Sequence, residues 1–162
     1  MSHRSAHSNT VIALFERILA AKRKRLLLGP KPMFEAYRAA SASHLSDVEK
    51  RIGCPLPDAL RSWLLRAGYG DINEELSFRE EWFSVIDRGQ LTGHVVFAQD
   101  ILGNSYSFSP RTGEVHYVCG SAPEYAFMTK DFRAFLEELE RRSFKLVEWA
   151  VGLPMSTYEW VV

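Results

Sequence analysis

The chain has 162 residues, of which 46% are hydrophobic and 12% aromatic, so it can bury a core without disulfides and does not have the composition of a disordered protein. Its 20 lysines and arginines balance its 20 aspartates and glutamates, so it lacks the excess positive charge of a nucleic-acid-binding protein. We therefore expect one compact domain that has no nucleic-acid partner.

Cysteine content and hydropathy indicate a cytoplasmic protein. Cys54 and Cys119 are too few for a disulfide framework, which favours buried free thiols in a reducing compartment over a single disulfide. The apolar runs are too short to cross a bilayer. Glu16 and Arg17 interrupt the N-terminal run, which argues against a signal peptide. We expect no transmembrane segment and no export signal.

Residues 1–42 are expected to form a helix and a linker. About eight frayed residues precede a helix that extends to about Leu27, because apolar residues recur there at helical spacing. These residues are Val11, Leu14, Phe15, Ile18 and Leu19. Gly29-Pro30 would end the helix, and the less regular stretch 33–42 is interpreted as a linker.

A basic run, KRKR, occupies Lys22–Arg25. We interpret it as the solvated end of the first helix, where positive charge complements the helix dipole. Two alternatives remain open: contact with nucleic acid, and contact with an anionic membrane, for which the preceding helix would serve as a surface anchor.

Two short helices are predicted next. Ser46 and Glu49 have the spacing of a capping box, and Gly53 is suited to end the first of these helices. Pro57 is suited to the start of the second helix, and Gly68 to its end. The expected buried faces are Leu45, Val48 and Ile52 in the first helix and Leu60, Trp63, Leu64 and Ala67 in the second.

The stretch His94–Val118 predicts three short antiparallel strands joined by two turns. Apolar residues alternate with serines in it, which is typical of a half-buried sheet. The apolar positions are Phe97, Tyr106, Phe108, Val115 and Tyr117, and the serines are Ser105, Ser107 and Ser109. Asp100 is expected to bond to the backbone of the first turn near Gly103, and Ser109–Gly113 forms the second turn.

The C-terminal part is expected to add a strand and helices. Trp82–Ile86 and Ala126–Met128 read as strands, and Thr129 as the cap of a following helix. That helix is expected to bury Phe132, Phe135, Leu136 and Leu139 and to expose the pairs Glu137–Arg141 and Glu138–Arg142. Phe144–Val151 predicts a second helical piece, before a tail whose Tyr158 and Trp160 pack back on the body.

These elements give an α+β fold. We predict a single antiparallel sheet of about four to six strands, packed by N-terminal and C-terminal helices. No internal repeat or low-complexity block divides the chain.

The order of the motifs resembles the SUKH superfamily, which includes fungal cell-wall-synthesis regulators and bacterial toxin-immunity proteins. The matching motifs are Val48-Glu49, Ile52-Gly53, Leu56-Pro57, Trp63-Leu64, Gly68, Phe97, Asp100, Gly103 and the stretch FRAFL at 132–136. The resemblance spans about residues 43–142. The helix and linker in 1–42 and the helical piece and tail in 143–162 lie outside it.

The resemblance implies a non-enzymatic protein-binding domain without a cofactor. The expected function is that of an immunity protein that binds and neutralises a bacterial toxin. The alternative is a regulatory or scaffold module without a toxin partner. A homo-oligomer is compatible with the sequence. Immunity proteins against nucleic-acid enzymes are often strongly acidic, so the neutral charge of this chain argues against a nuclease as the toxin.

An enzymatic site has little support in the sequence. His94, Asp100 and His116 are the only ligand-type residues near the predicted sheet, and no HxH or HExxH spacing occurs. We expect the histidines to be solvent-facing or hydrogen-bonded, with no metal and no catalytic role.

An acidic stretch is the candidate partner-binding site. We interpret Ile72–Glu81 as a loop in which carboxylates surround apolar residues, which suits a basic protein partner. The candidate residues are Asp71, Glu74, Glu75, Glu80, Glu81 and Trp82. The alternative is a solvated loop whose apolar residues, Ile72, Leu76 and Phe78, fold inward.

Overall fold

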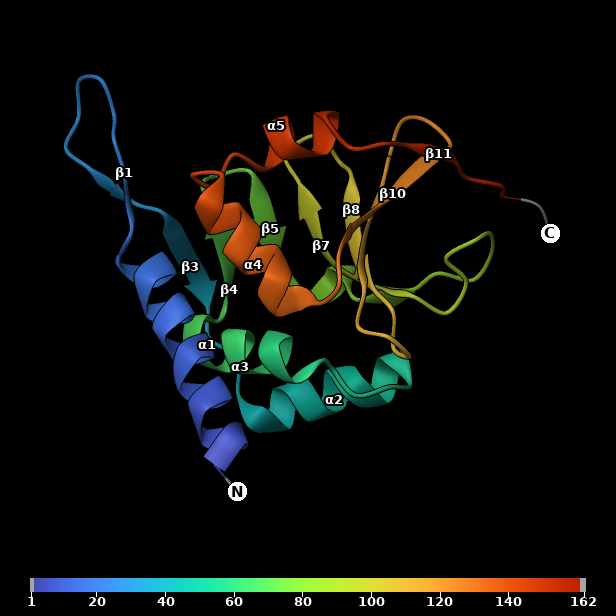
Figure 1. Cartoon of the computed structure of the whole chain (residues 1–162), viewed down its shortest axis with the longest axis horizontal. Coiled ribbons are helices and arrows are strands. Elements are labelled where there is room, and N and C mark those ends of the chain that lie inside the picture. The colour runs from blue at the N-terminus through green and yellow to red at the C-terminus, as the bar shows by residue number, and fades with distance from the viewer. Residues whose placement is uncertain (1, 161–162) are drawn as a thin grey trace.

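The computed structural model of the chain describes residues 2–160. Helices from the N-terminal, middle and C-terminal parts of the chain pack against a large sheet (Figure 1). The helices are α1 (Ser2–Ala20), α2 (Ala42–Ile52), α3 (Asp58–Ala67), α4 (Phe132–Arg141) and α5 (Leu146–Val151), with a 3-10 helix η1 (Glu80–Trp82).

The main sheet has nine antiparallel strands, in the order β11-β10-β9-β8-β7-β5-β4-β3, with β6 paired to β7. Its strands are β3 (Phe34–Arg38), β4 (Tyr69–Ile72), β5 (Leu76–Phe78), β6 (Ser84–Val85), β7 (Val95–Asp100), β8 (Ser105–Phe108), β9 (Val115–Val118), β10 (Glu124–Thr129) and β11 (Ser156–Thr157). A separate hairpin joins β1 (Lys22–Arg23) to β2 (Lys31–Pro32).

The α+β class and the three central strands are confirmed, but the predicted size of the sheet is wrong. The expected linker contains β3, the expected acidic loop is a hairpin made by β4 and β5, and the tail adds β11. The strands β3, β4, β5 and β11 account for the excess, whereas β6 lies within the predicted strand Trp82–Ile86.

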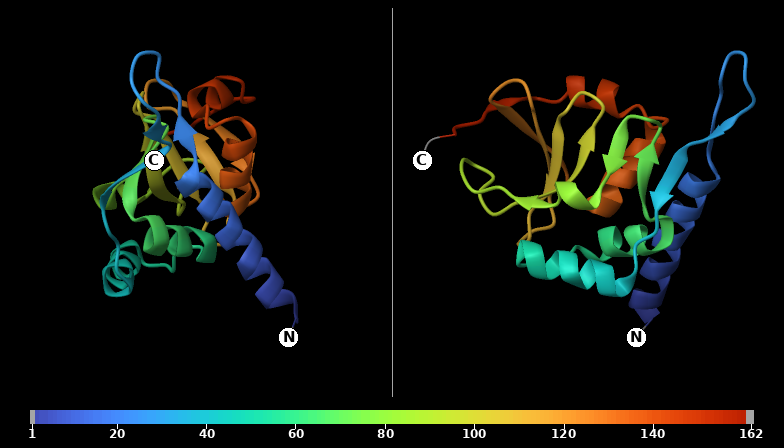
Figure 2. Two further views of the ribbon diagram at one scale, coloured as in Figure 1. Left: turned by 90° about the vertical axis from the view of Figure 1, so that its left-hand side faces the viewer. Right: turned by 180° about the vertical axis from the view of Figure 1, so that it is seen from behind.

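The helices lie mostly on one face and at one end of the main sheet. α4 lies in front of the strands and α1 runs along one side in Figure 1, while α2 and α3 lie at the lower end. From behind, most of the opposite face of the strands is visible, with α2 only at its lower edge (Figure 2). The covered face carries the aromatic core, where Phe97 packs edge-on against Phe132 at a ring-centroid distance of 5.5 Å.

The N-terminal helix belongs to this core. Leu14, Phe15 and Ile18 are at most 1% exposed, and the Phe15 ring lies 5.4 Å from that of Trp63 in α3. Arg17 forms an ion pair with Glu140 of α4 at 2.9 Å. Burial of this apolar stripe removes the alternative that the helix is a membrane-surface anchor.

Both predicted ends of the first helix are wrong. The helix begins at Ser2, so the expected frayed segment is helical, and it ends at Ala20 and not at Leu27. The apolar stripe has no surface to pack on beyond that point, and Leu27 is 96% exposed. The basic run therefore lies in the β1–β2 hairpin and not at a helix end.

The helices α2 and α3 form where predicted, with one cap misplaced. Ser41, and not Ser46, caps α2 by accepting a hydrogen bond from the backbone N–H of His44. The Glu49 carboxylate instead accepts from the N–H of Leu56 at 2.8 Å, and so fixes the link between the two helices. Gly53 ends α2 with φ of 78°, as the sequence indicated.

The C-terminal elements follow the prediction with smaller differences. Asp131 caps α4 in place of Thr129, because its carboxylate accepts from the N–H of Ala134 at 2.8 Å. Tyr158 packs back on the body at 2% exposure, whereas Trp160 remains 48% exposed, with its ring tilted by 48° against that of Tyr158. Glu137 pairs with Arg133 instead of Arg141, while Glu138 bonds both Arg141 and Arg142.

Candidate functional site

The candidate partner-binding residues lie on the β4–β5 hairpin and separate into two groups. Glu74 and Glu75 lie in its turn, whereas Glu80, Glu81 and Trp82 follow β5 at the other end. The apolar residues between them, Ile72, Leu76 and Phe78, are at most 1% exposed. Of the two interpretations of this stretch, the one with exposed apolar residues is wrong, and the inward packing of Ile72, Leu76 and Phe78 is confirmed, although the segment forms a hairpin and not a loop.

The turn of this hairpin uses two residues with positive φ and no glycine. Asn73 and Glu74 have φ of 54° and 55°, and the N–H of Glu75 donates to the carbonyl of Ile72 at 3.0 Å. Positive φ at two successive residues is typical of the tight turns of β-hairpins, and here the turn lies within a loop of three residues, 73–75.

Each glutamate of the turn holds another segment of the chain. The Glu74 carboxylate pairs with Lys31 and with Arg23, at 2.8 Å from the latter, and these hydrogen bonds lower the pKa of Glu74 to about 2. The Glu75 carboxylate accepts from the N–H of Leu146 at 2.7 Å, at the start of α5. Both carboxylates therefore bond other segments of the same chain.

The other group surrounds Arg79. Its guanidinium lies 4.6 Å from the centroid of the Tyr37 ring and 5.4 Å from that of Trp82, within the range of cation–π attraction. The Asp71 carboxylate lies 3.7 Å from the guanidinium and accepts a hydrogen bond of 2.6 Å from Ser77. We call Tyr37, Asp71, Arg79, Glu80, Glu81 and Trp82 the Arg79 cluster.

Helix α2 and strand β3 hold the edge of the Arg79 cluster. Arg51 of α2 donates to the backbone carbonyls of Glu80 at 2.9 Å and Phe83 at 3.3 Å. Arg38 of β3 pairs with the Glu80 carboxylate at 3.0 Å. These bonds fix η1, so the cluster has a defined shape before any partner binds.

The cluster is accessible to solvent. Tyr37 is 47% exposed, Glu81 is exposed, and Arg79 and Trp82 are half-buried. Burial, and secondarily the charge of Glu81, raise the pKa of the Tyr37 hydroxyl, so it stays protonated and able to donate a hydrogen bond near neutral pH.

Sequence reasoning missed Tyr37 and Arg79. The segment 34–38 was interpreted as a linker, although its sequence FEAYR alternates apolar and charged residues in its first half. A shift of register between Ala36 and Arg38 interrupts that alternation. The acidic residues dominate the stretch 71–82 in the sequence, and nothing local marks Arg79 as the residue that contacts two rings.

Two of the three ligand-type residues of the sheet lie together, and the third does not join them. His94 and His116 lie together, with ring centroids 5.1 Å apart, and burial lowers the pKa of both imidazoles. Asp100 instead accepts from the N–H groups of Leu102 and Asn104 and from the Tyr106 hydroxyl, in the turn role expected of it. Within residues 2–160, no three His, Cys, Asp or Glu side chains gather as metal ligands would.

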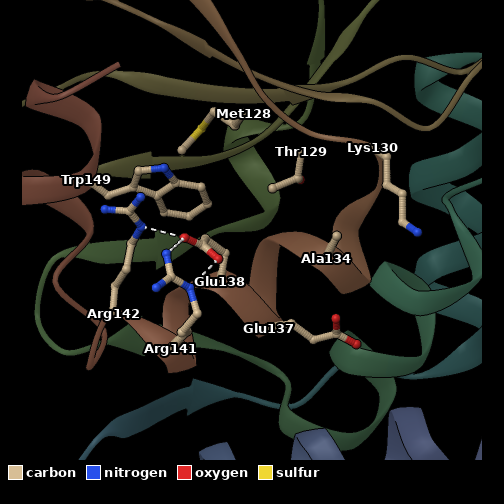
Figure 3. A pocket seen from close by; sticks show the side chains of 9 residues that line it. All are labelled: Met128, Thr129, Lys130, Ala134, Glu137, Glu138, Arg141, Arg142 and Trp149. Carbon is tan, nitrogen blue, oxygen red and sulfur yellow. Dashed lines mark hydrogen bonds and ion pairs between the residues drawn. The ribbon is translucent and has the colours of Figure 1, made fainter. Parts of the chain in front are cut away.

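A hollow of about 510 Å³ lies between β10, α4 and α5 (Figure 3). Glu138 at its rim bonds both Arg141 and Arg142, which lower the pKa of Glu138 to about 2. The Arg142 guanidinium also lies 5.2 Å from the Trp149 ring centroid. Both arginines of this hollow therefore bond the same carboxylate, and the arrangement does not resemble an acid–base site.

Comparison with known proteins identifies the family. The SMI1/KNR4 family (SUKH-1) matches residues 39–138, which is more than half of the chain. The chain belongs to this family. The matched part of this SUKH-1 chain extends from just before α2 into α4 and includes the Arg79 cluster except for Tyr37. Members are often immunity proteins of polymorphic toxin systems and are generally non-catalytic.

Searches of curated proteins and of solved structures gave no match to this SUKH-1 chain. Among the helices within residues 2–160, none has the length and apolar character needed to cross a membrane.

Proposed function

We propose that this SUKH-1 chain is a non-enzymatic immunity protein that binds a bacterial toxin domain through the Arg79 cluster and occludes the active site of the toxin. Family membership supports the class of function. The observation that carries the choice of surface is the Arg79 guanidinium held between the rings of Tyr37 and Trp82 on an accessible part of the molecule.

The composition of the cluster suits a protein interface. Trp, Tyr and Arg are the residues that most often dominate binding energy in such interfaces. Here they are adjacent, and Glu80 and Glu81 lie beside them. The carboxylates would steer a basic toxin surface during the encounter, and the rings would supply the apolar area buried in the complex.

The cluster is also preorganised. The ring contacts of Arg79 and the hydrogen bonds of Arg51 to η1 restrict these side chains in the free protein. Binding then loses less side-chain entropy than it would on a flexible loop, which raises affinity for the same contacts.

The test pairs this chain with the toxin domain encoded beside its gene. Co-expression is expected to rescue cells from the toxin, and the purified proteins are expected to bind each other. Trp82→Ala is expected to weaken binding by about 30-fold or more, the effect of removing an interface hot spot. Trp160→Ala removes an exposed tryptophan of the C-terminal tail and serves as the matched control.

The outcomes separate the proposal from its alternatives. Rescue by the native chain, with loss of affinity in Trp82→Ala only, supports both function and surface. Equal affinity of the two variants would reject the Arg79 cluster as the binding surface. Absence of rescue and of binding would reject the immunity function and leave a regulatory or scaffold module.

A further inference from the structure

The β1–β2 hairpin is a projection that the proposed function does not use. It extends from the end of α1 away from the body of the molecule (Figures 1 and 2). Lys22 pairs with Pro32 and Arg23 with Lys31, and residues 24–30 form the loop beyond them. At its base, Arg23 and Lys31 both bond the Glu74 carboxylate, which anchors the hairpin to the β4–β5 turn.

Three consecutive leucines occupy the tip of this hairpin. Leu26 is 103% exposed, Leu27 96% and Leu28 65%. By contrast, Leu14 on the adjacent α1 is 1% exposed. Contiguous exposed apolar side chains of this kind mark a surface that meets an apolar partner.

Basic residues surround the leucines. The segment 22–32, KRKRLLLGPKP, contains five basic residues and no acidic one. Lys22 and Lys24 are exposed, and Arg25, also exposed, donates to the carbonyl of Gly29 across the loop at 2.9 Å. The tip is therefore apolar at its end and positively charged just behind it.

We propose that this hairpin tip docks on a membrane surface that contains anionic lipids. The leucines would enter the boundary between headgroups and acyl chains, and Lys22, Lys24 and Arg25 would lie among the phosphates. Docking of this kind needs no helix that spans the bilayer. It is independent of whether the Arg79 cluster binds a toxin.

The shape and charge of the tip favour a membrane over other partners. The three leucines are 65% to 103% exposed on a loop that projects from the body, and fluid lipid can surround side chains that are exposed on all sides. A second copy would bring two positively charged hairpins together, which is unfavourable. A nucleic acid would contact the basic residues but would leave the leucines exposed, because stacking on bases requires aromatic or guanidinium planes.

The test measures partitioning of the full chain onto vesicles by co-sedimentation. Vesicles of equal parts phosphatidylglycerol and phosphatidylcholine are compared with vesicles of phosphatidylcholine alone. The native chain is expected to bind the anionic vesicles. The variant Leu26→Ser, Leu27→Ser, Leu28→Ser is expected to bind them at least about 100-fold more weakly, because the apolar side chains supply most of the insertion.

Matched controls test whether any exposed apolar or basic residue would have the same effect on vesicle binding as those of the hairpin tip. Ile101→Ser with Leu102→Ser removes two exposed aliphatic side chains, 68% and 65% exposed, from the β7–β8 turn and is expected to bind as the native chain does. The double variant Lys24→Gln, Arg25→Gln should bind the anionic vesicles about fivefold more weakly for each charge removed. Lys50 and Arg111 are exposed basic residues outside the hairpin, so the double variant Lys50→Gln, Arg111→Gln should lose less affinity for the anionic vesicles than the Lys24, Arg25 variant.

Each remaining outcome rejects the proposal. It is overturned if the native chain does not bind anionic vesicles, if it binds both kinds of vesicle equally, or if the leucine variant binds like the native chain. Self-association that the leucine variant abolishes, in the absence of vesicle binding, would assign the tip to a second copy instead. The leucines lie outside the core, so the variant should keep the native melting temperature, which excludes unfolding as the cause of lost binding.

Discussion

The two ends of the β4–β5 hairpin carry similar acidic sequences but have different surroundings. At the turn, Glu74 bonds two basic residues of the β1–β2 hairpin and Glu75 bonds the first turn of α5. At the other end, Glu81 is exposed beside the half-buried Trp82. The density of carboxylates in a sequence therefore does not show which of them bond other parts of the fold and which are free to meet a partner. The groups that each carboxylate contacts in the structure decide its role.

The largest effect on this comparison is expected from Glu75→Ala. The substitution leaves the N–H of Leu146 without its acceptor and should lower the free energy of unfolding by about 1–2 kcal/mol. For a chain of this length the melting temperature should fall by roughly 2–8 °C in a thermal melt. Affinity for the toxin domain should not change.

Glu75→Gln is the matched control for that experiment. It keeps a carbonyl acceptor for Leu146 and should restore most of the stability. If Glu75→Ala leaves the melting temperature unchanged but weakens toxin binding, the turn and the Arg79 cluster have been assigned to the wrong roles.

A smaller effect is expected from Glu81→Lys. This residue is exposed, so reversal of its charge should leave the melting temperature almost unchanged. Affinity for a basic toxin should fall by about 1 kcal/mol, mostly through a slower association rate. Stopped-flow or surface-based kinetics at low and high salt would measure it.

Glu148→Lys provides the corresponding reversal on α5, where the side chain is 76% exposed. Equal association rates for the two variants would show that long-range charge, and not the Arg79 cluster, steers the encounter.

The smallest effect concerns how the stability contributed by the Glu74 carboxylate depends on pH. Its pKa is lowered to about 2 by Lys31 and Arg23, so the stabilisation is present above the ordinary pKa of a glutamate and is lost as the pH falls towards 2. The contribution is small because the group is exposed to solvent. Carboxyl ¹³C NMR should give a midpoint near 2 in the native chain.

Replacement of both Arg23 and Lys31 by alanine should return the midpoint of Glu74 towards about 4.3, the value of an unperturbed glutamate. A native midpoint already in that range would show that the hairpin base is not held by these ion pairs in solution.

The sequence predicted those elements whose local signals agree with their tertiary setting. α2 and α3 have clear apolar stripes and end at Gly53 and Gly68, and in them periodicity and burial describe the same face. The strands β7 to β9 lie between the predicted turns, but four consecutive residues of β7, Val95–Ala98, are buried, so both faces of this strand are covered. The predicted boundaries differ from the observed ones by only a few residues.

The β4–β5 hairpin could not be predicted in the same way. Its turn places Asn73 and Glu74 at positive φ, where sequence reasoning looks for glycine at the second position. The contacts of this turn come from distant parts of the chain: the Asn73 side chain donates to the carbonyl of Phe144, and Glu74 pairs with Lys31 and Arg23, which lie 43 and 51 positions earlier. A long-range contact thus replaces the local signal.

The Arg79 cluster shows the same limit for the candidate site. Asp71, Glu80, Glu81 and Trp82 were selected by charge and proximity in sequence. Tyr37 joins them only because β3 pairs with β4, which no local pattern indicates. The sequence therefore located the acidic part of the surface but not its arginine–aromatic centre.

The edges of the main sheet lie outside the family match. β3 precedes residue 39 and β11 follows residue 138, so a fragment trimmed to the shared region would end its sheet at β4 and β10. Each would then present a row of unpaired N–H and C=O groups, which recruits strands from other molecules. The outer segments of the chain therefore pair with all of β4 and with Glu124 and Tyr125 of β10, and the strand that pairs with β4 also supplies Tyr37.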